Sequence, residues 1–390
     1  MSRLSLTSEG LRRAATQLVP TAVIAIFLAR AWVQLWSKVG TPESSFGVDL
    51  PAYVGAAHRL VATGSPYSAE LLEGPLARLP DSILVGYLYP PPLAQLFVPL
   101  RNIDPMWLAI GWSLAQVIIL GWLLVAVSVG ARGRLDRFGS LAAIALAVAS
   151  FPFQSAIYSG NVSGWVATAV AVMLLGSGRL AGAAAGLAAV VKVIPGPLAL
   201  AALVAPRSRP AVVSTGLLLV VGSFVLSPAS WAAWWSVLPN LAPLEPDGVS
   251  LAFILGDTPL AKPAAIAGLA ISVAFMLAAV RRTRRVGLDR AAVACAVGSY
   301  LFVVSALWDH YLAALVPLMV ATWPSGNRWQ RAAIIAGAVT QSLPWFWAGG
   351  KALAAFELAG ALVVLLASAH LGRGARHRFV TPSSVEISAP

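Results

Sequence analysis

The hydrophobic residues of this chain fall in long blocks that short polar stretches separate. The blocks span residues 17–36, 106–130, 138–157, 161–178, 211–228, 262–280, 290–307, 311–323, 331–348 and 352–371. A hydrocarbon core about 30 Å thick is crossed by roughly 20 helical residues. Backbone groups inside lipid must be paired within their own segment, and the alternating pattern of a membrane β-barrel is absent. The blocks therefore predict an all-α fold of membrane-crossing helices.

Two further apolar runs, 180–191 and 196–206, are only half as long. Lys192 and the pair Pro195 and Pro197 lie between them. Each run is too short to cross an unthinned bilayer alone, so we expect two short helices that meet at a polar point inside the protein. Counted separately, they bring the predicted total to about twelve membrane helices.

Two connecting loops are long, at residues 37–105 and 229–261. The first contains an amphipathic stretch at 51–62, which predicts a helix lying along the membrane surface. Loops of this length in compact proteins are usually functional. We expect one membrane domain over residues 1–372, followed by a basic, disordered tail at 373–390.

Composition excludes a soluble globular domain. Hydrophobic residues make up 58% of the chain, charged residues only 11%, and the mean hydropathy is +0.80. Soluble domains contain about 25% charged residues. The single cysteine, Cys295, lies inside an apolar block, which excludes disulfides and cysteine-based metal sites. The block at 17–36 is too long for a signal-peptide core and lacks a cleavage site, so it predicts a retained anchor.

The net charge of +12 indicates nucleic-acid binding in a soluble protein, but here the basic residues gather at the ends of the predicted spans. With the N-terminus in the cytoplasm, most of the 27 lysine and arginine residues fall inside, as the positive-inside rule requires. Most of the 15 acidic residues then fall outside. This predicts a multi-pass protein of the inner or plasma membrane, with both termini cytoplasmic and its chemistry on the outer side.

Asp49 is the first polar residue that this outer side offers for chemistry. It stands just before Pro51, at the start of the amphipathic stretch. One interpretation is a helix N-cap, which satisfies free backbone N–H groups. The other is a general base at the membrane surface, where a carboxylate deprotonates a sugar hydroxyl.

Other polar residues of the outer side are open to two interpretations as well. Arg59 either snorkels to lipid headgroups or binds a phosphate, and His58 lies beside it. Tyr89, in the Tyr-Leu-Tyr-Pro-Pro-Pro segment at 87–92, belongs either to an interfacial aromatic belt or to the wall of a substrate groove. Asn161 lies in a polar turn between two predicted spans, and an ordinary helix connection has the same composition.

Lys192 and the Trp-Asp-His segment at 308–310 carry stronger signals. A lysine between half-length apolar helices is costly in hydrocarbon, so it should face a cavity or an anion. A phosphate contact is the preferred role, and snorkelling through thinned membrane is the alternative. Asp309 and His310 are either a cap with an interfacial histidine or part of one site with Asp49, in which His310 donates to a phosphate.

No Walker motif or dinucleotide fingerprint is present, and the cytoplasmic loops are too short for a nucleotide-binding domain. An activated substrate would therefore have to arrive already in the membrane.

Several of these motifs together resemble glycosyltransferase family 87, over residues 15–372. This family contains GT-C mannosyltransferases that use polyprenyl-phosphate-mannose. The motifs are Asp49, the Tyr53, Ala57, Gly64 and Pro66-Tyr67 run, Tyr89-Pro90-Pro91, Gly160-Asn161, Lys192 with Pro195, and His310-Tyr311. Ser159 departs from the pattern, where a Gly-Gln-like turn is expected.

The resemblance implies an inverting transfer of mannose from polyprenyl-phosphate-mannose, in α linkage, to an outer-face glycolipid such as a phosphatidylinositol mannoside or to a glycan. It implies that Asp49 is the catalytic base and that Lys192, His310 and Arg59 bind the donor phosphate. Implied substrate-binding candidates are His58, Tyr53, Tyr89, Asn161, Asp309 and Trp308. The expected partners are the lipid donor, the glycolipid acceptor and the bilayer. No metal, cofactor or nucleic acid is expected, and a monomer is plausible.

Two other functions compete with this interpretation. One is a transferase for another polyprenyl-phospho-sugar, such as arabinofuranose, because contacts to sugar hydroxyls decide the donor. The other is a lipid or solute transporter, which also has many spans and intramembrane charges. Transporters often carry inverted repeats with broken helices in matching halves. This sequence has one interrupted region and no evident repeat.

Overall fold

The computed structural model describes residues 46–73, 86–132, 144–145, 150–176, 178–241, 247–256, 258–303, 306–345 and 350–370. The predicted anchor at 17–36, half of the predicted span 138–157 and the predicted tail at 373–390 lie outside these residues. Nearly all of the described chain is helical, as predicted. The exception is a parallel pair of two-residue strands, β1 (Asp247–Gly248) and β2 (Ala306–Leu307).

The helices form two groups along the chain. The first half contains α2 (Leu50–Thr63), α3 (Ala69–Glu73), α4 (Pro91–Phe97), the 3-10 helix η3 (Val98–Leu100), α5 (Pro105–Arg132), α7 (Phe151–Ser159), α8 (Ser163–Leu175), α9 (Arg179–Val191) and α10 (Gly196–Val204). The second half contains α11 (Arg209–Leu226), α12 (Pro228–Leu241), α13 (Leu251–Ile254), α14 (Ala261–Val286), α15 (Arg290–Phe302), η4 (Asp309–Leu315), α16 (Val316–Ser325), α17 (Arg328–Ser342), η5 (Leu343–Trp345) and α18 (Gly350–Ala369).

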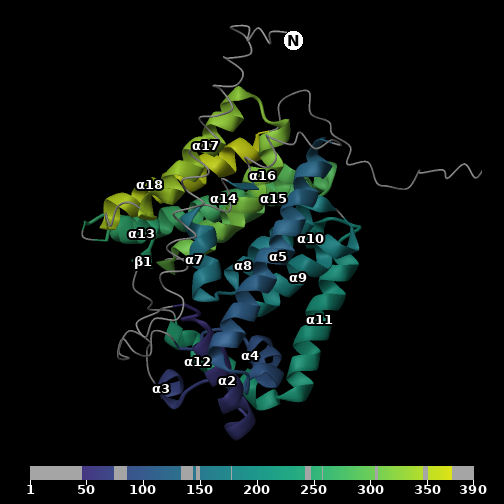
Figure 1. The fold of residues 1–390 in the computed structure, drawn as a ribbon, viewed down its shortest axis with the longest axis vertical. Helices are drawn as coiled ribbons and strands as arrows, with labels where there is room; N and C mark the ends of the chain where they lie inside the picture. Colours follow the sequence, from purple (N-terminus) through teal and green to yellow (C-terminus); the bar gives the residue numbers. More distant parts are fainter. Residues whose placement is uncertain are drawn as a thin grey trace, which may run out of the picture.

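Most of the helices gather toward one or the other end of the long axis of the molecule. Figure 1 shows α5 and α11 running along this axis, with α2, α3, α4 and α12 gathered at one end and α14 to α18 toward the other. Two apolar cores match this division. The larger one joins α5, α7 to α10 and α14 to α18, and the smaller one joins α2, α4 and α12.

Four described helices are long and apolar enough to cross a membrane: α5 over Pro105–Ser128, α11, α14 and α18. They coincide with the predicted spans 106–130, 211–228, 262–280 and 352–371. Helices α8, α9 and α15 are apolar but shorter. The total of about twelve spans stays a prediction.

The predicted span at 311–323 is not one α-helix. Its first half is the 3-10 helix η4 and its second half is α16, whose first turn contains Pro317. Proline has no N–H to donate and its ring excludes the preceding turn of an α-helix, so the two halves differ. The η4 residues after Asp309 are buried inside the protein.

The two half-length helices predicted around Lys192 are confirmed. Helix α9 ends at Val191, Lys192 is extended, and Pro195 precedes α10. Gly182 and Gly186 pack α9 closely on α11, because a Cβ at Gly186 would lie 3.1 Å from the carbonyl oxygen of Val212. Small residues at a helix interface let backbones approach in this way. Close packing against α11 thus stabilises the short helix α9.

The two long loops pack together. Tyr67, in the first loop, stacks on Trp234 of α12 with ring centroids 5.9 Å apart. The Asn240 amide donates to the carbonyl oxygen of Leu71 at 2.8 Å, and the Ser230 hydroxyl donates to that of Gly64 at 2.9 Å. The described part of the first loop therefore contains helices, as predicted, and α12 packs against it.

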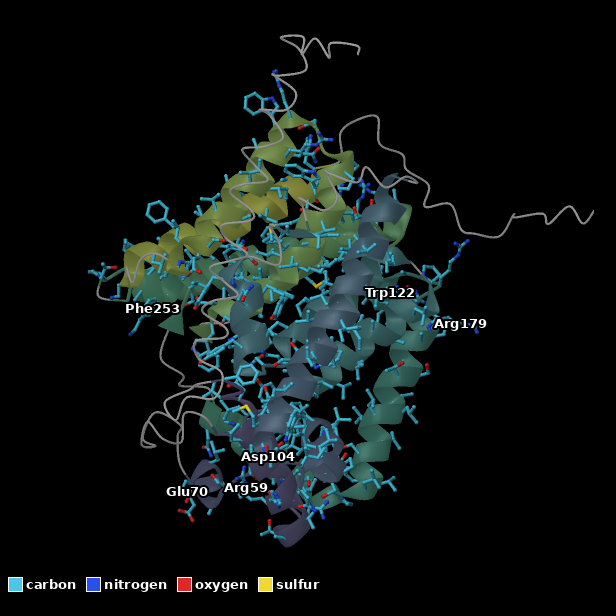
Figure 2. The ribbon with its side chains drawn as sticks, in the orientation of Figure 1. Arg59, Glu70, Asp104, Trp122, Arg179 and Phe253 are labelled. Atoms are coloured by element: carbon cyan, nitrogen blue, oxygen red, sulfur yellow. The ribbon has the colours of Figure 1, made fainter. Side chains whose placement is uncertain are left out.

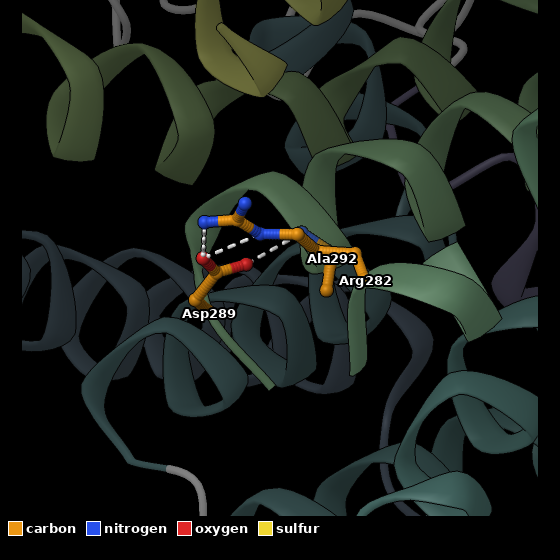
Figure 3. Close-up of polar contacts among 3 residues, drawn as sticks. All are labelled: Arg282, Asp289 and Ala292. Carbon is orange, nitrogen blue, oxygen red and sulfur yellow. Dashed lines mark hydrogen bonds and ion pairs between the residues drawn. The ribbon is translucent and has the colours of Figure 1, made fainter. Parts of the chain in front are cut away.

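At the junction of α14 and α15, Asp289 caps one helix and pairs with the other. Its carboxylate accepts from the backbone N–H of Ala292 at 2.9 Å and from Arg282 Nη2 at 2.6 Å (Figure 3). Both partners are partly exposed, so the ion pair contributes little, about 0–1 kcal/mol. The N-cap bond contributes about 1 kcal/mol more. Together they fix the turn between two helices that pack along each other.

Candidate functional site

The loop before α2 is fixed to the end of α7. The backbone N–H of Gly47 donates to the carbonyl oxygen of Tyr158 at 2.7 Å, and that of Asp49 donates to the carbonyl oxygen of Ser159 at 2.9 Å. Gly47 and Gly160 both have φ near +71°, in the left-handed region that favours glycine. Two backbone turns thus bring Asp49 against a segment more than a hundred residues later in the chain.

Asp49 occupies the N-cap position of α2, but its side chain makes no capping hydrogen bond. Its Oδ2 accepts instead from Asn161 Nδ2 at 2.8 Å. The interpretation as a helix cap is therefore wrong for the side chain, which faces the turn after α7. Burial raises the pKa of Asp49 above its ordinary value, while the bond from Asn161, the charge of Lys192 and a bond from Ser159 act to lower it.

Asn161 connects Asp49 to Lys192. Its Nδ2 donates to Asp49 and, at 3.3 Å, to the hydroxyl of Tyr89. Its Oδ1 accepts from Lys192 Nζ at 3.3 Å and from the backbone N–H of Ser163 at 2.8 Å. A carboxylate only accepts and an ammonium group only donates, so these partners fix the orientation of the amide. Asn161 is 2% exposed, so this network lies inside the protein.

Lys192 is buried at the point where α9 ends. Its Nζ donates to Ser163 Oγ at 2.9 Å and lies 3.7 Å from the ring centroid of Tyr311. In the part of the chain that the structure describes, no carboxylate lies within ion-pair distance of this nitrogen. A buried ammonium group whose direct contacts are neutral oxygens and an aromatic face is suited to receive an anion.

Aromatic rings enclose this polar cluster. The hydroxyl of Tyr53 donates to that of Tyr89 at 3.3 Å, and their rings meet edge to face. On the other side, Tyr311 stacks on Tyr300 with centroids 6.0 Å apart. Tyr53, on the inner face of α2, is thus connected through Tyr89, before α4, to Asn161 and Asp49.

Helix η4 brings the 308–311 segment to Lys192. The rings of His310 and Tyr311 lie 5.0 Å apart, and that of Trp308 lies 5.8 Å from His310. His310 is 9% exposed, and its Nε2 has no hydrogen-bond partner among the described residues. An imidazole nitrogen in this state can donate to an anion held at Lys192.

The structure does not bring His58 and Arg59 to this cluster. His58 Nε2 lies 3.1 Å from the carbonyl oxygen of Arg101 in an exposed position, and Arg59 Nε donates to the carbonyl oxygen of Pro66 at 2.9 Å. The inner face of α2 carries Tyr53 and Ala57, and the helical repeat turns the two basic residues away from it. Figure 2 shows Arg59 near Glu70 at the α2–α3 end of the molecule.

Two residues of the cluster were not predicted from the sequence. Ser163 accepts a hydrogen bond from Lys192, and Tyr300 stacks on the ring of Tyr311. Ser163 carries a sequence signal, because it lies two residues after Asn161 in the same polar turn. Tyr300 carries only a weak one, as a tyrosine inside an apolar block. The described residues contain no group of three or more histidine, cysteine, aspartate or glutamate side chains placed to hold a metal ion.

The model of glycosyltransferase family 87 matches residues 87–306, more than half of the 390 residues. The chain belongs to glycosyltransferase family 87. This confirms the family predicted from the motifs, and it identifies a membrane glycosyltransferase rather than a transporter. No curated protein and no solved structure was matched. Tyr89, Asn161 and Lys192 lie within the matched region, whereas Asp49 and His310 come to it from outside.

Replacing Gly160 with alanine should separate Asp49 from Asn161. The added Cβ would sit 2.8 Å from Leu50 Cγ at a positive φ, so the loop before α2 must move. We expect glycosyl transfer to fall at least about tenfold, since small displacements of reacting groups are costly. The assay is product formation by the purified variant.

Gly64→Ala is the matched control. Gly64 has a φ of 78° and nothing within 4 Å of the added Cβ, so it tests backbone strain alone. The strain should cost about 1–2 kcal/mol of stability in both variants. Equal activity of the two variants would show that the contact of Gly160 with Leu50 does not position Asp49.

Proposed function

We propose that this family 87 protein transfers mannose from polyprenyl-phosphate-mannose to an extracytoplasmic glycolipid or glycan hydroxyl, in α linkage and with inversion. The observation that carries the proposal is the pairing of a carboxylate with a separate buried cation across one amide. Asp49 and Lys192 bind the two ends of the Asn161 side chain. An inverting transfer needs a base and an anion-stabilising group, and this cluster offers both.

In the proposed reaction, the acceptor hydroxyl oxygen attacks the anomeric carbon of the mannosyl group. The bond from that carbon to the phosphate oxygen breaks, and the polyprenyl phosphate leaves with the electron pair. Asp49 takes the proton of the hydroxyl. Negative charge grows on the departing phosphate, where the fixed ammonium group of Lys192 and the ring of His310 stabilise it most.

An apolar groove beside the cluster supports a lipid-linked donor. It encloses about 420 Å³ between α4, α5, α8 and α9, and among the described residues that line it only Thr168 carries a hydroxyl group. Val162 and Val191 line it, and each is the sequence neighbour of a cluster residue, Asn161 and Lys192. Leu96 and Leu187 on its rim are about half exposed, so the groove opens sideways toward lipid. A polyprenyl chain in this groove would place its phosphate at Lys192.

The orientation of the helices supports an outer active site. Helix α11 starts at Arg209 and ends where α12 begins, in the smaller core that contains Tyr53. Helix α5 starts after Asp104 and ends at Arg132. Basic residues thus lie at the far ends of both helices, which the positive-inside rule assigns to the cytoplasm. We propose a plasma-membrane protein with cytoplasmic termini.

No observation favours arabinofuranose over mannose, and contacts to sugar hydroxyls decide between them. The direct test offers the purified protein a panel of polyprenyl-phospho-sugars with glycolipid acceptors and identifies the product by mass spectrometry. We expect an α-mannosylated lipid, formed without added metal. If only arabinofuranose is transferred, arabinofuranose rather than mannose is the donor sugar. If the protein transfers none of the lipid-linked sugars, the proposal is contradicted.

In the same assay, Asp49→Asn should lower turnover by about 10²–10⁴-fold, because the amide cannot take the acceptor proton. Asp104→Asn is the control, since Asp104 is an exposed carboxylate that only caps α5. Near-normal turnover of Asp49→Asn would remove this residue as the base.

The acidic limb of the pH–rate profile should report Asp49. A base must be ionised to act, so the rate falls as the pH drops through a pKa that burial raises above the ordinary carboxyl range. Asn161→Ala removes a bond that lowers this pKa, so its acidic limb should move to higher pH by about one unit. Initial rates of residual transfer measure the shift. A limb that stays in place would show that Asp49 does not control it.

A further inference from the structure

Glu357 is a buried carboxyl group that the proposed reaction does not use. It lies on the apolar helix α18 and is only 2% exposed. An acidic side chain within a membrane helix is costly, so such residues face a partner in the protein interior and mark functional positions. Glu357 lies beyond residue 306, outside the region that the family model matches.

The partner of Glu357 is Asp309, the first residue of η4, to which it is hydrogen-bonded. A hydrogen bond between two carboxyl groups needs a proton on one of them, because two adjacent like charges repel. The other oxygen of Glu357, Oε1, finds no hydrogen-bond partner in the part of the chain that the structure describes. The contact therefore joins α18 to η4, and the two helices also pack against each other.

Helix η4 has an irregular backbone that contacts of this kind stabilise. This 3-10 helix is seven residues long, although 3-10 hydrogen bonds have poorer geometry and runs beyond four residues are uncommon. Trp308 at its N-cap position supplies no side-chain capping bond. His310 and Tyr311 follow at once, and the ring of Tyr311 covers Lys192 Nζ at 3.7 Å. A shift at Asp309 would move both rings.

We propose that Glu357 is a positioning residue: it holds Asp309 at the start of η4 and so keeps His310 and Tyr311 against Lys192. The inference rests on the proposed function, which assigns the donor phosphate to Lys192. In this proposal Asp309 also fixes the position of η4, in addition to its predicted contact with the substrate. The proposed reaction assigns Glu357 no contact with the donor or the acceptor.

The test compares Glu357→Met with Glu357→Gln in the transfer assay with polyprenyl-phosphate-mannose. Methionine keeps the volume and suits a membrane helix, but it cannot bond Asp309. We expect kcat/KM for the donor to fall about ten- to a hundredfold, while KM for the acceptor stays near the wild-type value. Glutamine donates its amide to the Asp309 carboxylate, so Glu357→Gln should retain most of the activity.

Two further variants make the result specific. Because Glu357 acts through Asp309, the double variant Glu357→Met/Asp309→Ala should be no less active than Asp309→Ala alone. Ser368→Ala is the control on the same helix: Ser368 is buried and bonds Thr322 of α16, and its loss should leave kcat/KM unchanged.

Three results would overturn the inference: wild-type kinetics in Glu357→Met, equal losses in Glu357→Met and Glu357→Gln, or additive losses in the double variant. Each presupposes that the wild-type protein transfers mannose in the same assay. Absence of wild-type transfer would instead contradict the proposed function, so the two failures are distinguishable.

Discussion

A lysine ammonium group buried in an apolar helix bundle needs acceptors placed around it before the bundle can form. In this protein the acceptors are Asn161 Oδ1 and Ser163 Oγ, and the ring of Tyr311 covers the remaining side. The same asparagine holds Asp49 through its amide nitrogen. Because one buried amide serves both charges, the positions of the carboxylate and the ammonium group depend on each other.

Several irregular features of the fold determine the position of the Asn161 side-chain amide. Gly160 adopts a positive φ, which ends α7 and turns Asn161 inward. Helix α9 stops at Val191 after 13 residues, and its extended next residue, Lys192, carries the positive charge. Helix η4 replaces an α-helix where Tyr311 must meet Lys192. Broken helices at membrane depth are tolerated where protein surrounds them, and here they converge on one polar point.

The sequence predicted the parts of the fold that depend on local pattern. Apolar blocks identified α5, α11, α14 and α18, and the short runs around Lys192 identified α9 and α10. The motif resemblance selected Asp49, Asn161, Lys192 and His310, which the structure brings into one region. Arg59 shows the limit of such a prediction. Its charge suits a phosphate site, but the direction of its side chain depends on which face of α2 the core buries.

Contacts between distant segments could not be predicted from the local sequence pattern. The interpretation of Asp49 as an N-cap was reasonable from its neighbours, and only the backbone bonds of Gly47 and Asp49 to α7 show where its side chain points. The pairing of Glu357 with Asp309 likewise joins two segments that no spacing rule connects. Such contacts depend on tertiary packing, which a single sequence does not display.

The central claim is that the two charges of the cluster have separate tasks, Lys192 binding the phosphate and Asp49 the proton. Equilibrium binding of polyprenyl phosphate to the wild-type protein, Lys192→Met and Asp49→Asn tests it most directly. We predict that Lys192→Met binds polyprenyl phosphate at least about tenfold more weakly, because it loses a charge-assisted hydrogen bond. Asp49→Asn should bind it equally or more tightly. Unchanged binding by Lys192→Met, or equal weakening in both variants, would contradict it.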